Sequence, residues 1–333
     1  MRNAAVALAL LASSACGSSS NNNPSDGNPN GGDGGGSGSG QHDAGSGSNT
    51  IPSDRTVFVI VLENESSSAI YNSAAAPYIN TTIKPESAWA TMFTDELPAN
   101  VPSEPHYVWM EAGTNALSDY TFKNDSDASA GNSTASTLHL ATQLKTAGLD
   151  WRSYQEDLPA ACPIASSGFY AAKHDPFVFF TDVSGSPPSS TNAYCAAHHK
   201  AYSAFAADLA AGTMPAYVFI TPNLCNDMHG AIGCPSGTDI TRGDTWLSNE
   251  LPRIVTYAMA HDSIVYVVWD EGSSTQIIPF FAIGPHVKTG MTPTVYSHSA
   301  LLKSIEQQLG VPVLATVSAA PDFSGMFDAG YFP

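Results

Sequence analysis

Basic residues are scarce in this chain: 12 Lys and Arg stand against 30 Asp and Glu, and the formal net charge is −18 at pH 7. No run of Lys or Arg occurs in its 333 residues. Proteins that bind nucleic acid or anionic lipid through charge need such runs to neutralise phosphate groups. The composition therefore argues against a nucleic-acid partner. A small phosphate substrate is still compatible with it, because a bound metal ion can supply the positive charge.

Long apolar stretches are lacking too, and the one from Ala4 to Ala12 is too short to span a membrane. Arg2 precedes it and Ser13-Ser14-Ala15 follow it, which is the order of an export signal. The next residue is Cys16, as in a bacterial lipoprotein, although a serine stands where leucine is usual. We expect residues 1–16 to be a lipoprotein-type signal peptide with a lipid anchor at Cys16, or else an ordinary secretory signal. Either way the protein is exported, to the outer membrane or cell surface, or into the periplasm or medium.

Residues 17–50 consist almost wholly of Gly, Ser, Asn, Asp and Pro. Such a segment has no apolar side chains to bury, so we expect a flexible linker with a mean reach of roughly 30 Å. Residues 51–333 have the composition of one globular domain, which we expect to be the catalytic unit. Neither a second low-complexity segment nor an internal repeat divides it.

Cysteine is rare, with five in the chain, and four remain after Cys16. An even number in an exported protein predicts disulfides, and four cysteines allow three pairings. Proximity favours Cys225 with Cys234 and Cys162 with Cys195. A four-cysteine zinc site is the alternative, but the CxxC spacing typical of such sites is absent.

Helices and strands are predicted to alternate along the domain. Val57–Leu62 and Ile264–Trp269 are rich in β-branched and aromatic residues, as are strands buried on both faces of a parallel sheet. Repeated helix–Gly–strand units predict a three-layer α/β/α sandwich with a mostly parallel central sheet. We expect strands at 57–62, 151–154, 216–221, 264–269 and 277–283, a strand or loop at 88–93, and helices at 74–83, 103–112, 137–147, 201–211, 246–259 and 299–309.

The two apolar strands each end in a pair of oxygen ligands, Glu63-Asn64 and Asp270-Glu271. In open α/β sheets, ligands bind beyond the carboxyl ends of the strands. Carboxylates at one point repel each other unless a proton, hydrogen bonds or a cation stabilise them. We therefore expect one divalent metal ion there. Oxygen ligands favour calcium, magnesium or manganese.

Three further histidines and one aspartate are candidates for the same site. Asp227 and His229 lie in the loop after the 216–221 strand, which a Cys225–Cys234 disulfide would steady. The alternative for that loop is an Asx-rich surface turn. His174 and His298 are weaker candidates, because a lone histidine is more often structural than catalytic. If His174 and His229 do lie near the metal, zinc or iron would also be tolerated.

Ser103 stands at the predicted start of the helix at 103–112. A serine there can cap the helix, which is a common structural role. The same position stabilises negative charge on its oxygen and offers free backbone N–H groups to an anion. A hydroxyl becomes a good nucleophile when a base or a metal activates it. Ser103 is therefore a candidate nucleophile next to the metal ligands.

Nine segments in chain order carry a resemblance to a known family. They are Leu62–Asn64, Ala76–Asn80, Pro102–Tyr107, Tyr154–Pro159, Lys173–Phe177, Thr221–Asn223 with Asn226–His229, Gly243–Leu247, Trp269–Gly272, and Tyr296–His298 with Leu301–Glu306. In them the chain resembles the bacterial phosphoesterase family of secreted acid phosphatases and phosphatidylinositol-type phospholipases C. That family belongs to the alkaline-phosphatase superfamily, so the resemblance implies an alkaline-phosphatase-like fold. It looks closest to the short secreted acid phosphatases.

The resemblance assigns a role to each candidate residue. It implies a phosphoryl-accepting nucleophile at Ser103, and substrate contacts at His106 and His298. The remaining residues are metal ligands at Glu63, Asn64, Asp270 and Glu271, and phosphate-site residues at His174, Asp227 and His229. The chain departs from the family pattern at His106, where Asn is usual, at Gly230, where an acidic residue is frequent, and in a short segment after Glu271.

The expected function is metal-dependent hydrolysis of phosphate monoesters, as in acid phosphatases, through a phosphoserine intermediate. One alternative is a phospholipase C-type phosphodiesterase, which acts on a phospholipid headgroup with the same residues. Another is a non-catalytic surface lipoprotein that keeps the fold as a binding module. Hydrolysis of a monoester would separate the first reading from the second, and metal binding would separate both from the third.

Overall fold

Nine strands form one sheet in the part of the chain that the computed structural model describes, residues 55–98 and 100–333. The predicted signal peptide, the lipid anchor at Cys16 and the linker lie outside the described residues. The strand order is β4-β3-β5-β1-β6-β8-β2-β7, and β9 pairs with β2. The strands are β1 Val57–Leu62, β2 Ala88–Thr94, β3 Trp151–Gln155, β4 His199–Ala201, β5 Tyr217–Thr221, β6 Ile264–Trp269, β7 Ile277–Ile278, β8 Phe280–Ile283 and β9 Gly290–Ser297.

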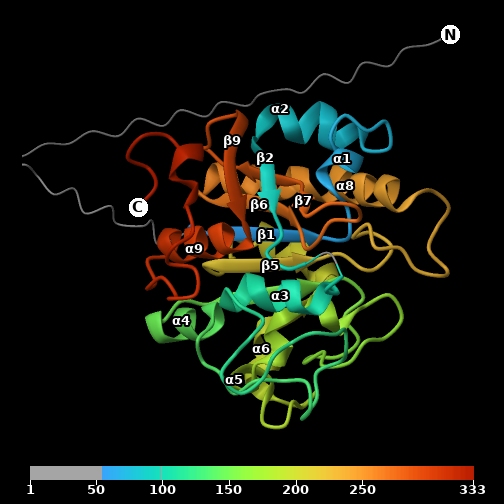
Figure 1. Cartoon of the computed structure of the whole chain (residues 1–333), viewed down its shortest axis with the longest axis vertical. Coiled ribbons are helices and arrows are strands. Elements are labelled where there is room, and N and C mark those ends of the chain that lie inside the picture. Colours follow the sequence, from blue (N-terminus) through green and yellow to red (C-terminus); the bar gives the residue numbers. More distant parts are fainter. Residues whose placement is uncertain (1–54, 99) are drawn as a thin grey trace, which may run out of the picture. The chain divides into compact units, whose positions relative to one another are not determined.

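The strands that lead to the predicted site are parallel. β4, β3, β5, β1 and β6 are parallel neighbours, and β1 and β5 run side by side through the middle of Figure 1. β8 is antiparallel to both β6 and β2, and β7 is antiparallel to β2. All residues of β1 and β6 are buried, as their continuous apolar sequences predict. The predicted mostly parallel sheet is therefore confirmed.

Helices cover both faces of this sheet. Phe58 of β1 contacts the rings of Phe205 and Tyr257 on one face. Phe219 of β5 points to the other face and contacts Tyr107. The arrangement is the predicted three-layer sandwich. The helices are α1 Ser67–Ile70, α2 Lys84–Glu86, α3 Ser103–Ala112, α4 Leu140–Ala147, α5 Thr181–Ser184, α6 Ala193–His198, α7 Phe205–Ala210, α8 Asp239–Ala260 and α9 His298–Gln308, with short turns η1 Ile79–Ile83, η2 Ala172–His174, η3 Pro176–Phe179, η4 Tyr202–Ala204 and η5 Phe323–Met326.

Several predicted bounds are wrong, and side-chain hydrogen bonds or Pro explain two of them. The helix predicted at 74–83 begins later and runs through the π-helix η1 into α2, because the Asn80 side chain donates to the carbonyls of Ile70 and Ala76 and holds turns at residues 71–75. The strand predicted at 277–283 is divided into β7 and β8 at Pro279, which has no N–H for a ladder hydrogen bond.

Two other bounds differ because of tertiary pairing and capping, and one strand was not predicted. The helix predicted at 201–211 is shortened to α7, since residues 199–201 pair with β3 as strand β4. The helix predicted at 246–259 starts earlier as α8, where Thr238 caps it by accepting from the N–H of Thr241. Strand β9 has no counterpart among the predictions, because most of its residues are exposed and it contains Pro293.

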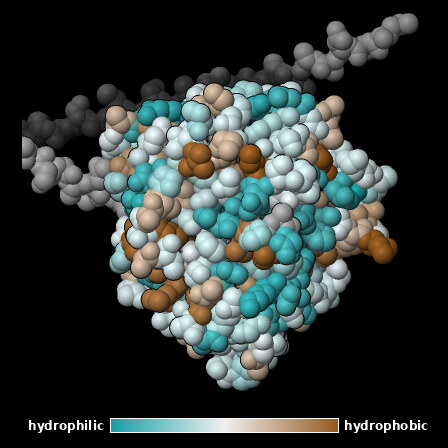
Figure 2. All heavy atoms as spheres, in the orientation of Figure 1, coloured by the Kyte–Doolittle hydropathy of each residue, from teal (hydrophilic) through white to brown (hydrophobic). Residues whose placement is uncertain are grey.

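Two disulfides join the predicted pairs, Cys162 with Cys195 and Cys225 with Cys234. The four-cysteine zinc alternative is therefore wrong, and the disulfides agree with export to an oxidising compartment. Figure 2 shows one face of the molecule, on which hydrophilic and neutral residues predominate and apolar groups are scattered. Of the helices in the described part of the chain, none is both long and apolar enough to cross a membrane.

Candidate active site

The ends of three neighbouring strands bring the predicted site residues together. β5, β1 and β6 are adjacent in the sheet, so the residues that follow them lie at one edge. The N–H of Glu63 donates to the carbonyl of Asp227 at 2.7 Å, and the N–H of Asp270 donates to the carbonyl of Leu62 at 3.0 Å. The second bond continues the β1–β6 ladder by one residue, and the first joins the end of β1 to the loop after β5. They place three buried carboxylates, on Glu63, Asp227 and Asp270, around one point.

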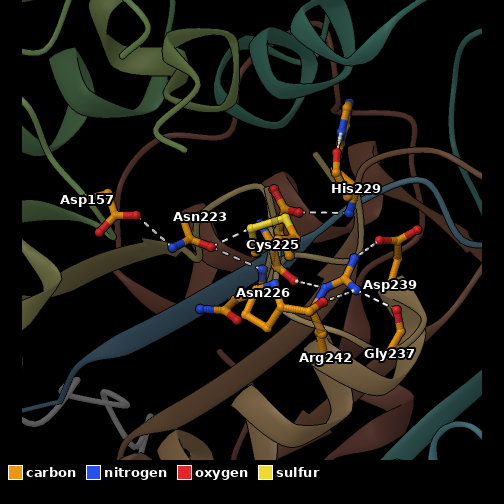
Figure 3. Close-up of a disulfide and its surroundings, with 12 residues drawn as sticks. Asp157, Asn223, Cys225, Asn226, His229, Gly237, Asp239 and Arg242 are labelled. Atoms are coloured by element: carbon orange, nitrogen blue, oxygen red, sulfur yellow. Dashed lines mark hydrogen bonds and ion pairs between the residues drawn. A yellow bond between two sulfur atoms is a disulfide. The ribbon is translucent and has the colours of Figure 1, made fainter. Parts of the chain in front are cut away.

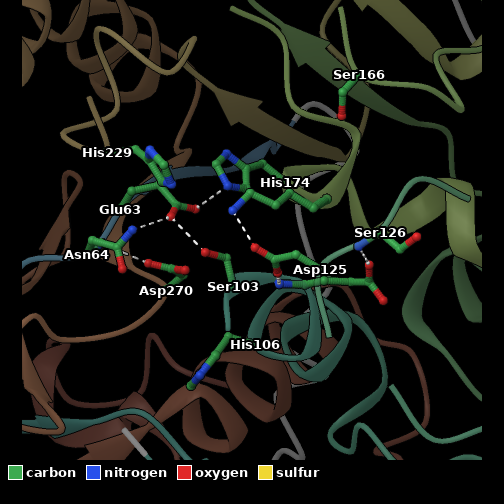
Figure 4. A network of polar contacts seen from close by, with 12 residues as sticks. Glu63, Asn64, Ser103, His106, Asp125, Ser126, Ser166, His174, His229 and Asp270 are labelled. Carbon is green, nitrogen blue, oxygen red and sulfur yellow. Dashed lines mark hydrogen bonds and ion pairs between the residues drawn. The ribbon is translucent and has the colours of Figure 1, made fainter. Parts of the chain in front are cut away.

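Ser103 is buried at the start of α3, and its side chain is directed toward these carboxylates. Its Oγ lies 3.1 Å from Oε2 of Glu63 and 3.3 Å from Oε1 of Glu271, as Figure 4 shows for the first of these contacts. The hydroxyl has one proton, so it donates to one carboxylate at a time. The α3 N-terminus also stabilises negative charge on the serine oxygen. The residue predicted as nucleophile therefore has two carboxylates within reach as proton acceptors.

His174 lies between two of the carboxylates. Its Nε2 is 3.1 Å from Oε1 of Glu63, and its Nδ1 is 3.4 Å from Oδ2 of Asp227. The ring stacks on Tyr107, with centroids 5.0 Å apart and an interplanar angle of 11°. Burial lowers the pKa of His174 well below the usual value, and the charge of Lys173 lowers it further. His174 is therefore a neutral, firmly oriented imidazole in the described site.

Asn64 has a left-handed backbone, with φ of 55°, a region that Asn tolerates better than most residues. This turn lets its N–H donate to Oδ1 of Asp270 at 3.0 Å, while its Nδ2 donates to Oε2 of Glu63 at 3.2 Å. Both carboxylates are thereby oriented by one residue. Both donors of Asn64 are thus used by these carboxylates, and its side-chain amide oxygen is the atom that could coordinate a cation.

The loop after β5 orients His229. Its N–H donates to Oδ1 of Asp227 at 2.8 Å, and its Nδ1 lies 2.8 Å from the carbonyl oxygen of Gly230. Because a carbonyl only accepts, Nδ1 carries the proton and Nε2 is left to bind a metal or a substrate. Gly230 has φ of +80°, and a Cβ there would collide with the Asp239 carboxylate. The family often has an acidic residue at the position of Gly230, and in this chain the carboxylate of Asp239 lies directly beside that position.

The disulfide and α8 hold this loop (Figure 3). Arg242 of α8 donates through Nε to the carbonyl of Cys225 at 3.1 Å and through Nη1 to that of Gly237 at 2.6 Å. Gly243 of α8 packs so closely on Met228 that a Cβ would collide with that side chain. Next to it, Asp244 accepts from the N–H groups that begin η1. The loop that carries Asp227 and His229 is therefore fixed from two sides.

The buried charges fit a divalent cation. Burial raises the pKa of Glu63, Asp227 and Asp270 well above their usual values, and their mutual repulsion adds to the shift. Among the described residues, one oxygen of each carboxylate and Nε2 of His174 are buried without a hydrogen-bond partner. Ligand atoms of Glu63, His174 and His229 lie within 4.8 Å of one another. The residues present thus form a possible metal site, with imidazole nitrogens beside the predicted oxygen ligands.

The predicted substrate residues His106 and His298 lie deeper. Both rings are buried, with centroids 6.3 Å apart. Nε2 of His298 is 2.9 Å from the carbonyl oxygen of Trp269, and Nε2 of His106 is 3.2 Å from that of Val101 and 3.8 Å from Oε2 of Glu271. Burial and the neighbouring His298 lower the pKa of His106 to about 3. Both rings are held by backbone carbonyls behind Glu271, and their contact with substrate stays a prediction.

Lys173 and Asp125 are the site residues that sequence reasoning missed. Nζ of Lys173 lies 2.5 Å from Oδ2 of Asp125. Burial lowers the pKa of Lys173, but the carboxylates of Glu63 and Asp125 outweigh it, so the pKa is raised. Lys173 could have been predicted to lie at the site, because it directly precedes the candidate residue His174 in the sequence. Asp125 lies in an irregular loop, and the sequence contains no comparable signal for it.

Comparisons with known proteins agree with this geometry. Residues 95–312 match the Phosphoesterase family. A phosphatidylinositol-3-phosphatase of Mycobacterium tuberculosis is 30% identical over 289 residues, which cover 85% of this chain and 86% of that protein. A phosphate-repressible acid phosphatase of Penicillium chrysogenum is 29% identical over 67% of this chain and 53% of that protein. The chain thus spans about half the length of the fungal relative.

Solved structures establish the fold independently of sequence. A phosphonate monoester hydrolase from Silicibacter pomeroyi has a TM-score of 0.53 at 11% identity, covering 83% of this chain and 78% of that one. A protein in the alkaline phosphatase superfamily from Vibrio parahaemolyticus has a TM-score of 0.50 at 12% identity, covering 80% and 70%. The fold is alkaline-phosphatase-like, and the chain belongs to the phosphoesterase family, whose activity is the hydrolysis of phosphate esters.

Proposed function

We propose that this protein is a metal-dependent phosphatase that hydrolyses phosphate monoesters through a phosphoserine intermediate on Ser103. The supporting observation is the position of the Ser103 hydroxyl, within hydrogen-bond distance of Glu63 and Glu271. The same carboxylates border the cluster that fits a divalent cation. A nucleophile, its proton acceptors and a place for positive charge therefore meet at one point.

The side chains divide the reaction between them. Ser103 Oγ attacks phosphorus and passes its proton to a carboxylate, while the bond from phosphorus to the leaving oxygen breaks. His229 protonates that oxygen when its Nε2 also carries a proton, a contribution of typically ~10²–10⁴-fold. The neutral His174 lies against the carboxylates of Glu63 and Asp227. Water then attacks the phosphoserine, which releases inorganic phosphate and restores the hydroxyl.

The metal would be held by Glu63, Asn64, Asp270 and Glu271, with His174 and His229 as the nearest nitrogen donors. A bound divalent ion neutralises charge on phosphoryl oxygens and lowers the cost of ionising a serine hydroxyl. Oxygen ligands favour calcium, magnesium or manganese, whereas the two imidazoles also admit zinc or iron.

The substrate class that we propose is a small phosphate monoester, including a phosphorylated inositol headgroup. The name of the Mycobacterium tuberculosis relative supports the lipid headgroup, and those of the fungal relatives support simple monoesters. A phospholipase C-type diesterase would use the same nucleophile on a different ester. The test below therefore compares the two ester classes directly.

The test measures turnover of 4-nitrophenyl phosphate, phosphatidylinositol 3-phosphate and bis(4-nitrophenyl) phosphate by the wild-type protein and by Ser103→Ala. We expect both monoesters to be hydrolysed faster than the diester, and Ser103→Ala to lose turnover with an unchanged melting temperature. Ser318→Ala, at an exposed serine, is the matched control. Full activity in Ser103→Ala would refute the mechanism, and a preference for the diester would favour the phospholipase reading. A wild-type protein that binds no divalent metal and hydrolyses none of the three would indicate a binding module.

A further inference from the structure

The carboxylate of Asp125 bridges two hydrogen-bond donors beside Ser103. Its Oδ2 lies 2.5 Å from the ammonium of Lys173, and its Oδ1 accepts from the backbone N–H of Glu104 at 3.0 Å. Glu104 directly follows Ser103 in the first turn of α3, and Lys173 directly precedes His174. Figure 4 shows Asp125 between the helix of Ser103 and the segment of His174.

These two donors have the chemistry of a phosphate-binding subsite. A backbone N–H at the N-terminus of a helix and an ammonium group are both strong donors to phosphate oxygens. The N–H of Glu104 belongs to the residue after the attacking serine, and the carboxylate of Asp125 spans from it to the ammonium of Lys173. A phosphate placed for attack by Ser103 therefore lies beside the position that this carboxylate occupies. The other charged groups around Ser103, those of Glu63 and Glu271, are acidic. These carboxylates repel an incoming phosphate, whereas the ammonium of Lys173 and the N–H of Glu104 attract it.

The side chain of Asp125 can leave the donors while the loop backbone stays in place. The Glu104 carboxylate accepts from the N–H of Ser126 at 2.8 Å. Oδ1 of Asp127 accepts from the N–H of Ser166 at 3.0 Å and from its hydroxyl at 2.6 Å. These bonds hold the two residues that directly follow Asp125. The Asp125 side chain itself is 30% exposed, which leaves it a route to solvent by rotation alone.

We propose that Lys173 Nζ and the Glu104 N–H bind the substrate phosphate, and that the Asp125 carboxylate occupies this subsite in the free enzyme as an internal competitor. This inference rests on the proposed function. A phosphate must displace Asp125 to reach both donors, so its affinity is reduced by the fraction of molecules in which the carboxylate holds them. Asp125 therefore sets the concentration of phosphate ester at which the enzyme works, and favours release of product phosphate.

The test is calorimetric titration of the full chain with inorganic phosphate, with the same divalent ion present throughout. We expect Asp125→Ala to bind phosphate about tenfold more tightly than the wild type, since both donors are freed, and Lys173→Met to bind it about tenfold more weakly. The KM for 4-nitrophenyl phosphate should change in the same directions. Melting temperatures show whether each variant is folded.

Two matched controls separate the subsite from a general change of charge. Asp127→Asn removes a negative charge from the same loop, but its carboxylate contacts Ser166 and neither donor. Lys200→Met breaks an ion pair of similar length, 2.7 Å to Asp208, outside the site. We expect both to bind phosphate within about twofold of the wild type, because exposed charges contribute little at a distance.

Three results would overturn the inference. Unchanged or weaker phosphate binding by Asp125→Ala would mean that Asp125 only positions Lys173, and unchanged binding by Lys173→Met would remove Lys173 from the subsite. Equal tightening in Asp127→Asn would reduce the effect to net charge. If Ser103→Ala abolishes turnover in the same preparation, the proposed function survives any of these results. If the wild type neither binds phosphate nor hydrolyses monoesters, both proposals are wrong.

Discussion

The Ser103 hydroxyl lies 3.1 Å from Oε2 of Glu63, although 40 positions separate the two residues. The other oxygen of the same carboxylate lies 3.1 Å from Nε2 of His174. Glu63 thus contacts both the proposed nucleophile and a neutral imidazole of the site. It is also one of three buried carboxylates that repel each other. Function and stability therefore make opposite demands on this side chain.

Replacement of Glu63 by glutamine should separate these two demands. We expect Glu63→Gln to lose about 10²-fold or more in kcat/KM, because Ser103 loses a proton acceptor and the metal a charged ligand. In metal-free buffer the same variant should melt at a higher temperature than the wild type, since one of the repelling charges is removed. Enzyme kinetics and thermal melts measure the two effects. The exposed Glu86→Gln is the control, and a metal-free Glu63→Gln that melts lower than the wild type would contradict the repulsion argument.

Metal binding should appear as a gain in stability. A divalent ion that binds only the folded protein stabilises it by about 2.7 kcal/mol at a hundred times its dissociation constant. We expect the melting temperature of the wild type to fall on chelation and to recover with added ion, and that of Glu63→Gln to respond much less. A series of calcium, magnesium, manganese, zinc and iron(II) would identify the preferred ion. A wild-type melting temperature that responds to none of them would refute the metal site.

The disulfide that closes the Asp227–His229 loop should matter more for activity than for stability. Its loop has a sequence separation of 9 residues, against 33 for Cys162–Cys195. Chain entropy then predicts losses of about 2–3 and about 3–4 kcal/mol on removal. We expect the double variant Cys225→Ala with Cys234→Ala to have a reduced kcat at temperatures well below its melting temperature, where it is still folded, because His229 is no longer held. Wild-type kcat in this double variant would show that Arg242 and Gly243 suffice to hold the loop.

Glu306 should make stability depend on pH independently of the site. Its buried carboxylate, at the end of α9 away from His298, has a pKa that burial raises to about 7, partly offset by the N–H of Leu314. In the unfolded chain this carboxylate has the ordinary Glu pKa of 4.5, so the folded state binds more protons between pH 4.5 and 7. Stability is therefore lost as the pH rises through this interval, by roughly 1–3 kcal/mol.

Glu306→Gln should remove this loss, because a neutral amide does not ionise. Urea unfolding at several pH values between 4.5 and 7 gives the free energy of unfolding of the variant and of the wild type, and the difference between the two measures the loss. Glu86→Gln, at an exposed glutamate, is the control. The variant should gain in relative stability as the pH rises. A difference that stays constant over this range would show that Glu306 ionises at its ordinary pH in the folded protein.

Local features of the sequence were sufficient for the elements that lead to the site. The bounds of β1 and β6 are those predicted, and α3 begins at Ser103 as expected. A strand buried on both faces is visible as a continuous apolar run, and a helix start is set by the few residues around it. Strand β9 escaped prediction because it is mostly exposed and has no such run.

The sequence by itself thus predicted the bounds of β1 and β6, the start of α3, the favoured disulfide pairs and the acidic residues that follow the two strands, since these depend on apolar pattern and on proximity along the chain. Only the tertiary structure decided which side chains meet. Asp125 reaches Lys173 across 48 positions, and Glu271 reaches Ser103 across 168. Such contacts depend on the order of β5, β1 and β6 in the sheet, which is set by packing of the whole core and not by any local pattern.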